Sequence, residues 1–275
     1  MSSLIVIVGP CLLESEQLGD EVASELVKIR DEHKNVRFIF KASIDKANRS
    51  SIRSARGLGW DAGLKVMATL KKRYNMEVTS DFHDPRQAES LAEVCDVVQV
   101  PAFLCRQTDV LAAAARTGRT VSVKKGQFLA PWDMKYVVEK LHTFGAKEIF
   151  QLERGTSFGY GNLVVDMRSF PIMSKNGHPV IYDVTHSLQL PGKGGETTAG
   201  AREFADTLAL AAIGAGVDGL FLETHPRPAE ALCDAETQLP LKTLADCLRQ
   251  YITFHSARSR LCHEHDSAQK NASFS

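Results

Sequence analysis

The sequence predicts a protein of the α/β class that folds as a single (β/α)8 TIM barrel. Its 275 residues suit one such barrel, since barrels of this kind commonly use 200–250 residues or more. Short apolar runs alternate along the chain with segments of helical spacing, which is typical of a parallel sheet. The alternative is an open doubly wound sheet, but no G-x-G-x-x-G follows the first run.

The predicted strands are runs rich in β-branched and other apolar residues that end in polar residues. Most are almost continuously apolar, as expected of parallel strands covered on both faces. In chain order they are Leu4–Val8, Arg37–Phe40, Glu77–Thr79, Val97–Val100, Thr120–Val123, Glu148–Leu152, Val180–Asp183 and Gly219–Leu222. Eight strand–helix units at this length favour a closed barrel.

The segments between these runs carry apolar residues at helical spacing. In the first of them, Ser15 is a candidate N-cap and Leu18, Val22, Leu26 and Ile29 share one face. The predicted helices are Ser15–His33, Gly63–Tyr74, Pro85–Val94, Asp109–Thr117, Trp132–Phe144, Arg202–Gly214 and Leu241–Ser256.

Two segments do not fit the alternation. The Gly-rich stretch 191–200 follows the seventh strand, which is the position of an active-site loop in a barrel. Residues 258–275 are polar and aperiodic, so we expect a disordered C-terminal tail there. The expected domain organisation is therefore one catalytic barrel over residues 1–257, followed by this tail.

Charge and composition exclude several classes of partner. The chain has 33 basic and 33 acidic side chains, so its bulk charge gives no reason to expect nucleic acid or an anionic membrane. No apolar run approaches the length of a membrane span, and the first residues lack the pattern of a signal peptide. We therefore expect a cytoplasmic protein, in which the six cysteines are thiols rather than a disulfide framework.

Cationic side chains follow four of the eight predicted strands. Because the carboxyl ends of barrel strands meet at one mouth, these side chains should converge there. They are Lys41, Lys46, Arg49, Arg106, Lys124 and Arg154, and the small donors Ser43, Asn48 and Ser50 lie beside them in the sequence. Such a group suits a phosphorylated small molecule. Six cations exceed the need of one phosphate, so we expect two anionic groups or two phosphorylated ligands.

Residues able to bind a metal follow the first, seventh and eighth strands, which are neighbours in a closed barrel. They are Cys11, His186 and Glu223, and Asp234 lies close enough in sequence to return to the same mouth. A thiolate, an imidazole and two carboxylates suit a divalent ion such as Zn²⁺, Fe²⁺ or Mn²⁺. No local ligand motif occurs, so spacing alone leaves Cys11 open as a packed thiol, and His225 is a rival for the histidine ligand.

After the third strand, Asp81 and His83 are candidates for acid–base chemistry. A capping role before Pro85 is an equally good interpretation of these two residues.

At these strand ends the chain resembles the 3-deoxy-D-manno-octulosonate 8-phosphate synthase family. The string K-A-S-I-D-K-A-N-R-S-S at 41–51 is long and specific. Further matching segments are Q-V-P-A-F-L-C-R-Q at 99–107, V-K-K-G-Q-F at 123–128, E-R-G-T-S-F-G-Y at 153–160, D-V-T-H-S at 183–187 and E-T-H-P at 223–226. One departure is Gly161, where relatives often have Asn.

The resemblance implies a (β/α)8 barrel, usually a homotetramer, that condenses phosphoenolpyruvate with D-arabinose 5-phosphate. Its product feeds lipopolysaccharide synthesis. By the family pattern, phosphoenolpyruvate is held by Lys41, Ser43, Lys46, Gln99, Lys124 and Arg154. The sugar phosphate is held by Asn48, Arg49 and Ser50, with Arg106 reaching in from a neighbouring subunit. The catalytic residues would be Lys46, Asp81, Asn48 and His186.

The family has metal-dependent and metal-independent branches, and the second has Asn at the position of Cys11. G-P-C at 9–11 and C-D-A-E-T-Q at 233–238 resemble the metal-dependent branch. The resemblance therefore implies one divalent ion bound by Cys11, His186, Glu223 and Asp234.

Two other functions compete with this one. The sister enzyme, 3-deoxy-D-arabino-heptulosonate 7-phosphate synthase, uses erythrose 4-phosphate and typically carries K-P-R-T where this chain has K-A-N-R-S at 46–50. A catalytically silent barrel that only binds sugar phosphates is the other alternative, and the intact candidates at every strand end argue against it.

Overall fold

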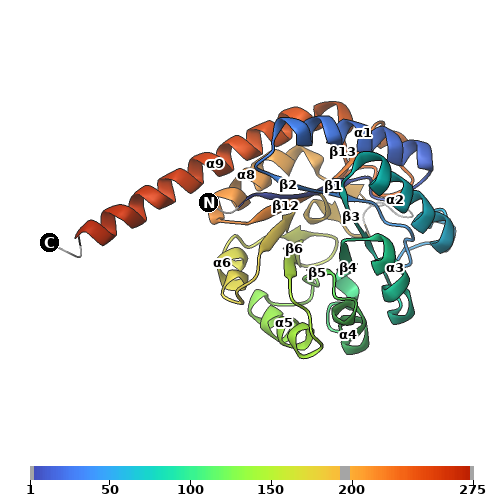
Figure 1. Ribbon diagram of the computed structural model, residues 1–275, viewed down its shortest axis with the longest axis horizontal. Coiled ribbons are helices and arrows are strands. Elements are labelled where there is room, and N and C mark those ends of the chain that lie inside the picture. The colour runs from blue at the N-terminus through green and yellow to red at the C-terminus, as the bar shows by residue number, and fades with distance from the viewer. Residues whose placement is uncertain (1–2, 193–198, 273–275) are drawn as a thin grey trace.

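The chain folds as a closed barrel in a computed structural model that describes residues 3–192 and 199–272. Within these ranges, eight parallel strands pair in chain order and β1 pairs with β12 to close the ring. They are β1 (Ile5–Gly9), β2 (Arg37–Lys41), β3 (Glu77–Asp81), β4 (Val97–Val100), β5 (Thr120–Lys124), β6 (Ile149–Glu153), β9 (Val180–Asp183) and β12 (Gly219–His225). The predicted TIM barrel is confirmed, and Figure 1 shows the strands inside a layer of helices.

Helices connect successive strands and cover the outside of the barrel (Figure 1). They are α1 (Glu16–Glu32), α2 (Trp60–Tyr74), α3 (Ala88–Val94), α4 (Thr108–Arg116), α5 (Met134–Thr143), α6 (Ser169–Ser174), α8 (Ala205–Ala215) and α9 (Leu241–Ala272). A further short helix, α7 (Val184–Ser187), follows β9 directly. Helices α6 and α7 were not predicted, because four to six residues are too few to show a helical period.

Short elements complete the connections. Single 3₁₀ turns are η1 (Pro85–Gln87), η2 (Ala102–Leu104), η3 (Pro131–Asp133), η4 (Arg202–Phe204) and η5 (Pro228–Glu230). The two-residue strands are β7 (Thr156–Ser157), β8 (Leu163–Val164), β10 (Gln189–Leu190), β11 (Ala199–Gly200) and β13 (Leu239–Pro240). Most of the predicted loop at 191–200 lies outside the described residues.

The first helix illustrates how local sequence sets the element boundaries. Ser15 has an extended backbone and its hydroxyl accepts a hydrogen bond from the Leu18 N–H at 3.0 Å, which satisfies one of the donors left free at a helix N-terminus. Leu18, Val22, Leu26 and Ile29 are all buried against the barrel. The predicted cap and apolar face are both confirmed.

The strands bury side chains on both faces. The barrel interior is a separate cluster of strand residues, namely Ile5, Ile7, Ile39, Val97, Phe150, Leu152, Ile181 and Phe221. Their neighbours along the strands, such as Val6 and Val8, pack instead against the surrounding helices. This alternation fills the inside of the barrel below the mouth, so a ligand can enter only at the ends of the strands.

The C-terminal helix is longer than the predicted segment that ends at Ser256. Helix α9 continues to Ala272, and its last part extends away from the barrel (Figure 1). Alanine, arginine, leucine, glutamate, glutamine and lysine in this segment favour a helix even without an apolar face. Arg258 contacts the barrel, because its Nε donates to the Gly214 carbonyl at the end of α8, 3.2 Å away.

No helix among the described residues is both long enough and apolar enough to span a membrane.

Candidate active site

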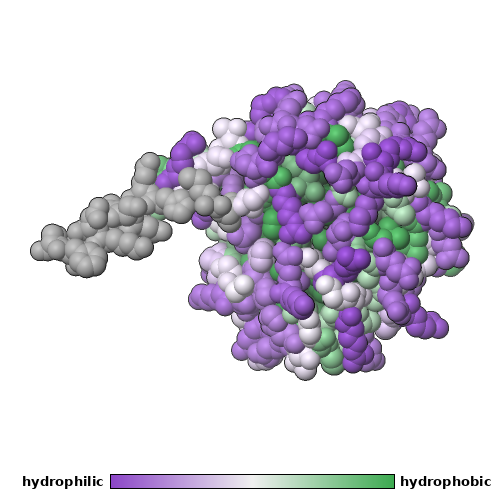
Figure 2. Space-filling view, in the orientation of Figure 1, coloured by the Kyte–Doolittle hydropathy of each residue, from purple (hydrophilic) through white to green (hydrophobic). Residues whose placement is uncertain are grey.

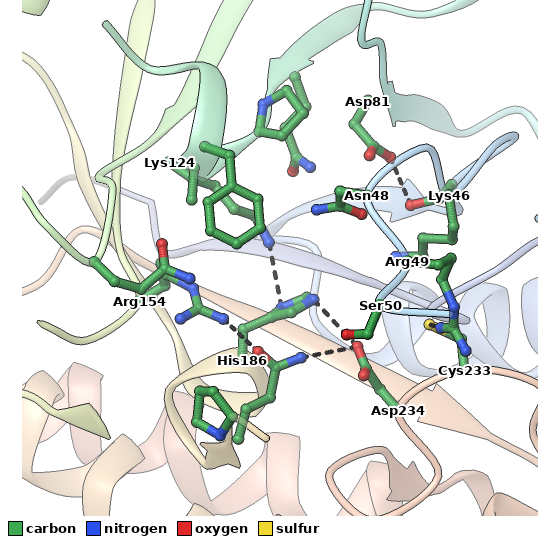
Figure 3. A pocket seen from close by; sticks show the side chains of 18 of the residues that line it. Lys46, Asn48, Arg49, Ser50, Asp81, Lys124, Arg154, His186, Cys233 and Asp234 are labelled. Carbon is green, nitrogen blue, oxygen red and sulfur yellow. Dashed lines mark hydrogen bonds and ion pairs between the residues drawn. The ribbon is translucent and has the colours of Figure 1, made fainter. Parts of the chain in front are cut away.

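A cavity of about 230 Å³ opens at the carboxyl ends of the strands, where barrel enzymes bind their substrates. Ten of the predicted site residues line it: Lys41, Ser43, Lys46, Asn48, Arg49, Ser50, Asp81, Gln99, Lys124 and Arg154. His186 and Asp234 line it as well. Figure 3 shows Lys124 and Arg154 on one side of the mouth and Asn48, Arg49 and Asp81 on the other.

The segment after β2 brings several of these residues over the mouth. Its first part pairs with the end of β1, since the Ser43 N–H donates to the Cys11 carbonyl at 3.3 Å and the Leu13 N–H to the Ser43 carbonyl at 2.9 Å. Gly57 lets the returning chain pass close to this segment: its φ is +121° and a Cβ there would lie 2.3 Å from the Ile44 carbonyl oxygen. Any larger residue would push the two segments apart.

Four cations of the mouth are almost fully buried: Lys41, Lys46, Lys124 and Arg154 are 1–8% exposed. Charged groups are buried only when they have partners. The Lys41 Nζ lies 2.7 Å from Glu223 Oε1, and the Lys124 Nζ lies 2.6 Å from Asp183 Oδ2. Part of this positive charge is therefore neutralised by carboxylates beneath the cavity floor.

The charges below the mouth shift one another's pKa values. Burial alone would raise the pKa of Glu223, but the nearby His186 and then the neighbouring lysines hold it well below its ordinary value. Burial lowers the pKa of Lys124, although Asp183 opposes this change. The carboxylates therefore stay ionised and available as acceptors or ligands.

Arg154 retains hydrogen-bonding capacity toward the cavity. One of its nitrogens, Nη2, donates to Gln189 Oε1 at 2.5 Å. The other, Nη1, is buried and has no hydrogen-bond partner among the described residues. Burial lowers the pKa of this guanidinium, as expected where desolvation exceeds the attraction of nearby carboxylates. A buried, unpaired donor beside a cavity is what an anionic ligand would satisfy.

The four predicted metal ligands lie together. One candidate ligand atom from each of Cys11, His186, Glu223 and Asp234 falls within a group no wider than 4.8 Å. The Cys11 Sγ is 3.4 Å from Asp234 Oδ2, and His186 Nε2 is 3.4 Å from Glu223 Oε1. Residues separated by up to 223 positions in the chain thus form one cluster beside the cations of the mouth.

The surroundings of this cluster fit a divalent cation. Glu223 Oε2 is buried without a hydrogen-bond partner in the described part of the chain. Burial, followed by the proximity of Cys233, raises the pKa of the Cys11 thiol well above its ordinary value, a penalty that a bound cation would offset. His186 directs Nδ1 at Asp183, 2.9 Å away, which leaves Nε2 for an ion. A thiolate, an imidazole and two carboxylates are donors suited to zinc or iron.

His225 does not belong to this cluster. Its side chain is buried, and its Nε2 lies 3.7 Å from Glu14 Oε1. Its Nδ1 accepts the Arg227 backbone N–H at 3.0 Å. Of the two histidines that the sequence left open, position therefore favours His186 as the candidate ligand.

Arg106 does not line the mouth cavity of its own chain. It is exposed and lines a separate hollow with Tyr136 and Lys140. Its expected role is in the site of a neighbouring subunit, so that role stays a prediction.

Asp81 ends β3, and the Nε2 of His83 lies 3.4 Å from Asp81 Oδ2. The Ser43 hydroxyl donates to Asp81 Oδ1 at 2.5 Å. Burial would raise the pKa of Asp81, but Lys46 and then Lys41 lower it to about 2. The helix-capping role before Pro85 belongs instead to Asp84, whose side chain accepts the Arg86 N–H at 2.9 Å.

Several residues of the site were missed from the sequence. Gln189 links the two halves of the mouth, since its amide nitrogen donates to Asp234 Oδ2 at 3.0 Å and its oxygen accepts from Arg154. Gln238 holds the Cys11 backbone N–H at 3.1 Å, and Cys233 lines the cavity. Cys233 and Gln238 lie in the C-D-A-E-T-Q segment that resembles the metal-dependent branch, although no role was predicted for either. The only signal for Gln189 was its nearness to His186 in the sequence.

Comparison with known proteins agrees with this geometry. Residues 2–257 match the DAHP synthetase I family. A protein of Desulfotalea psychrophila named 2-dehydro-3-deoxyphosphooctonate aldolase is 50% identical over 254 residues, covering 92% of this chain and 90% of that protein. Proteins of the same name from Trichlorobacter lovleyi and Pelobacter propionicus are 51% and 52% identical, covering 90% and 88% of this chain and equal shares of theirs. The chain belongs to the DAHP synthetase I family.

Proposed function

We propose that this chain condenses phosphoenolpyruvate with D-arabinose 5-phosphate and water. The products are 3-deoxy-D-manno-octulosonate 8-phosphate and inorganic phosphate, for lipopolysaccharide synthesis. The observation that carries the proposal is the set of four nearly buried cations around one cavity, with Arg154 Nη1 unpaired among the described residues. The name shared by the relatives, 2-dehydro-3-deoxyphosphooctonate aldolase, denotes action on an eight-carbon sugar acid phosphate.

Phosphoenolpyruvate would occupy the buried side of the mouth. The expected contacts are Lys41, Ser43, Lys46, Gln99, Lys124 and Arg154, all of which line the cavity. An Arg guanidinium binds two phosphate oxygens at once, and lysines add point charges. Lys41 and Lys124 are each paired with a carboxylate, whereas Arg154 Nη1 has no partner among the described residues. Arg154 is therefore the best placed of these residues to bind the phosphate directly, and Lys124 adds positive charge beside it.

The sugar phosphate would occupy the outer side of the same cavity. Asn48, Arg49 and Ser50 line it there and belong to the segment that matched the family string. In a homotetramer, Arg106 of a neighbouring subunit would complete this phosphate site. Exposed aromatic side chains near the mouth support such an assembly: Phe103 lines the cavity and is 56% exposed, and Phe128 is 57% exposed.

The reaction joins carbon 3 of phosphoenolpyruvate to the aldehyde carbon of the sugar. Water adds at carbon 2, where positive charge develops, and phosphate leaves by cleavage of its C–O bond. Holding both phosphates in cationic pockets makes the encounter effectively intramolecular, worth up to about 7–11 kcal/mol in favourable cases. Orientation of two anionic substrates is therefore the main contribution of the lysines and arginines.

One divalent ion, Zn²⁺, Fe²⁺ or Mn²⁺, would be held by Cys11, His186, Glu223 and Asp234. When bound, it would polarise the aldehyde oxygen and orient the sugar hydroxyls. The cluster adjoins the cavity, because His186 and Asp234 line it. Asp183 fixes the orientation of the His186 ring for this purpose.

Lys46 and Asp81 are the proposed groups for handling protons, beside Asn48 and His186 as further catalytic residues. Burial alone would lower the pKa of the Lys46 ammonium, but nearby acidic groups, first the Cys11 and Cys233 thiols, raise it well above its ordinary value. With Asp81 ionised, Lys46 is a proton donor or an electrostatic stabiliser at neutral pH, and Asp81 is the acceptor of the pair.

One assay tests the proposal. The purified protein is incubated with phosphoenolpyruvate and each aldose phosphate, and released phosphate is measured. We expect release with arabinose 5-phosphate. Release only with erythrose 4-phosphate would favour 3-deoxy-D-arabino-heptulosonate 7-phosphate synthase, the alternative suggested by the family description. Binding of both substrates without phosphate release would indicate a silent barrel.

We also propose that the enzyme works in the cytoplasm. The support for this location is that both proposed substrates are phosphorylated metabolites. Fractionation of cells that express the chain would test it.

A further inference from the structure

A further buried charged pair, Lys125 and Glu153, lies next to Lys124 and Arg154. Neither of its members is among the site residues described above. Lys125 and Glu153 are 0% and 1% exposed, and Lys125 Nζ is 3.4 Å from Glu153 Oε1. Lys125 follows Lys124 directly after the end of β5, and Glu153 ends the adjacent strand β6, directly before Arg154. A buried ion pair seldom adds stability over apolar side chains of similar size, so its presence at this point suggests another role.

The Lys125 amine ties together the two loops that carry the phosphate-binding residues. It donates to the Leu129 carbonyl at 3.1 Å and to the Gly126 carbonyl at 3.3 Å, both in the loop after β5. Its third hydrogen bond, at 3.1 Å, reaches the Thr156 hydroxyl in the loop after β6. One ammonium group thus uses three donors to link two loops.

Glu153, at the end of β6, holds the backbone that follows Arg154. Its Oε1 accepts the Gly155 backbone N–H at 2.7 Å, which fixes the turn immediately after Arg154. Gly155 has a φ of +92°, a conformation that an L side chain rarely adopts. The carboxylate therefore stabilises an unusual backbone on one side of Arg154 while it neutralises Lys125 on the other.

Both loops contribute to the cavity wall. Gln127 lies between two acceptors of the Lys125 amine and lines the cavity, and its carbonyl accepts the Ser157 N–H at 3.0 Å. Arg154 follows Glu153 directly and lines the same cavity. A change in the separation of the two loops would therefore change the separation of Lys124 and Arg154.

We propose that Lys125 and Glu153 are positioning residues, which hold Lys124 and Arg154 at the spacing required to bind the phosphate of phosphoenolpyruvate. This inference rests on the proposed function for the identity of the ligand. Neither side chain is exposed to the cavity, so each acts through its neighbour in the chain.

The test compares Lys125→Met with Lys71→Met. Lys71 has similar chemistry outside the mouth, because its amine donates to the Val94 carbonyl at 3.0 Å and to Asp96 Oδ1 at 2.6 Å. Two quantities are measured for each variant: the temperature of unfolding, and the Kd of phosphoenolpyruvate by calorimetry without the sugar phosphate. Both substitutions should lower the unfolding temperature. Only Lys125→Met should weaken phosphoenolpyruvate binding, by up to about 100-fold.

Further variants separate positioning from folding. Lys125→Arg retains a charged donor and should recover part of the affinity. Lys125→Met combined with Glu153→Gln removes the unpaired carboxylate charge and should recover stability without recovering affinity. If Lys125→Met does not fold, Glu153→Gln alone is the decisive variant, with at least tenfold weaker binding expected. Turnover should show an increased KM for phosphoenolpyruvate with a smaller change in the KM for arabinose 5-phosphate.

The inference is overturned if folded Lys125→Met, or Glu153→Gln in its place, binds phosphoenolpyruvate as the unsubstituted protein does. It is equally overturned if Lys71→Met loses as much affinity as Lys125→Met. The proposed function fails differently: the unsubstituted protein would bind phosphoenolpyruvate but release no phosphate when arabinose 5-phosphate is added. The two failures are therefore distinguishable.

Discussion

The Asp183 carboxylate contacts His186 at two points, the backbone N–H and the imidazole ring. The His186 backbone N–H donates to Asp183 Oδ1 at 3.1 Å, and its ring Nδ1 lies 2.9 Å from the same oxygen. Asp183 ends β9 and caps the short helix α7. The carboxylate favours the tautomer with the proton on Nδ1, so the lone pair of Nε2 faces Glu223 and Asp234.

Asp183→Asn should weaken metal binding by about 10- to 100-fold, the usual effect of losing such a partner of a ligating histidine. The measurement is competition for Zn²⁺ with a chromogenic chelator. Asp218→Asn is the matched control, because Asp218 likewise accepts a backbone N–H, that of Val180 at 2.8 Å, at the other end of β9. Equal metal affinity in both variants would contradict the role given to Asp183.

Removal of metal by a chelator should abolish phosphate release, and added Zn²⁺, Fe²⁺ or Mn²⁺ should restore it. In Cys11→Ala the same addition should restore little, because the ligand group loses its thiolate. The assay is phosphate release before and after dialysis against chelator. Full activity of metal-free Cys11→Ala would exclude the metal assignment.

The fold was predictable because buried parallel strands produce continuous apolar runs. Such runs can be recognised in the sequence without any knowledge of the tertiary structure. Much of the site was predictable for a related reason: residues such as Lys124 and Asp81 end the strands themselves, and a barrel gathers strand ends at one mouth. What could not be predicted comes from loops. Gln189 and Cys233 reach the cavity through paths that no local period encodes.

The same limit applies to pairs that act across strands. Lys125 stands next to Lys124 in the sequence, and nothing local distinguishes an amine that faces a ligand from one buried behind it. Only the register of β5 against β6 brings Lys125 to Glu153. The role of Arg106 depends on a second subunit and stays a prediction.

Arg154→Met should raise the KM for phosphoenolpyruvate by about 10- to 100-fold, since a hydrogen bond to a charged group contributes about 1.5–3 kcal/mol. Arg154→Lys should recover only part of the loss, because an ammonium cannot bind two phosphate oxygens in the plane of a guanidinium. Arg168→Met is the control: its side chain is 84% exposed and pairs with Asp166. Steady-state kinetics measure all three, and an unchanged KM in Arg154→Met would contradict direct binding.

Gly9→Ala should destabilise the protein and reduce its activity. A Cβ at Gly9 would lie 2.0 Å from the Lys41 carbonyl oxygen, so β1 and β2 would have to separate where Lys41 enters the mouth. Overpacking of this kind costs about 1–3 kcal/mol. Gly214→Ala is the matched control within α8: no atom lies within 4 Å of its Cβ position, and alanine should stabilise the helix by up to about 1 kcal/mol. Urea unfolding measures both, and equal effects would contradict the argument.

The pair formed by His142 and His178 predicts a loss of stability in acid. Their Nε2 atoms lie 2.8 Å apart, a distance that requires one nitrogen to accept. Burial, followed by the charge of His142, lowers the pKa of His178. The unfolded chain therefore binds a proton more readily, and the stabilisation from neutral His178 is complete above its ordinary pKa of about 6.5.

This stabilisation is lost as the pH falls through the lowered pKa of the folded state. Urea unfolding at pH 7.5 and pH 5.5 should show a smaller loss on acidification in His178→Gln than in the unsubstituted protein. His142→Gln should give an intermediate loss, because burial of His178 remains when the neighbouring charge is removed. Other acid-sensitive groups are common to all three proteins, so they cancel in the comparison. If the loss is the same in His178→Gln and the unsubstituted protein, the pair does not set the acid sensitivity.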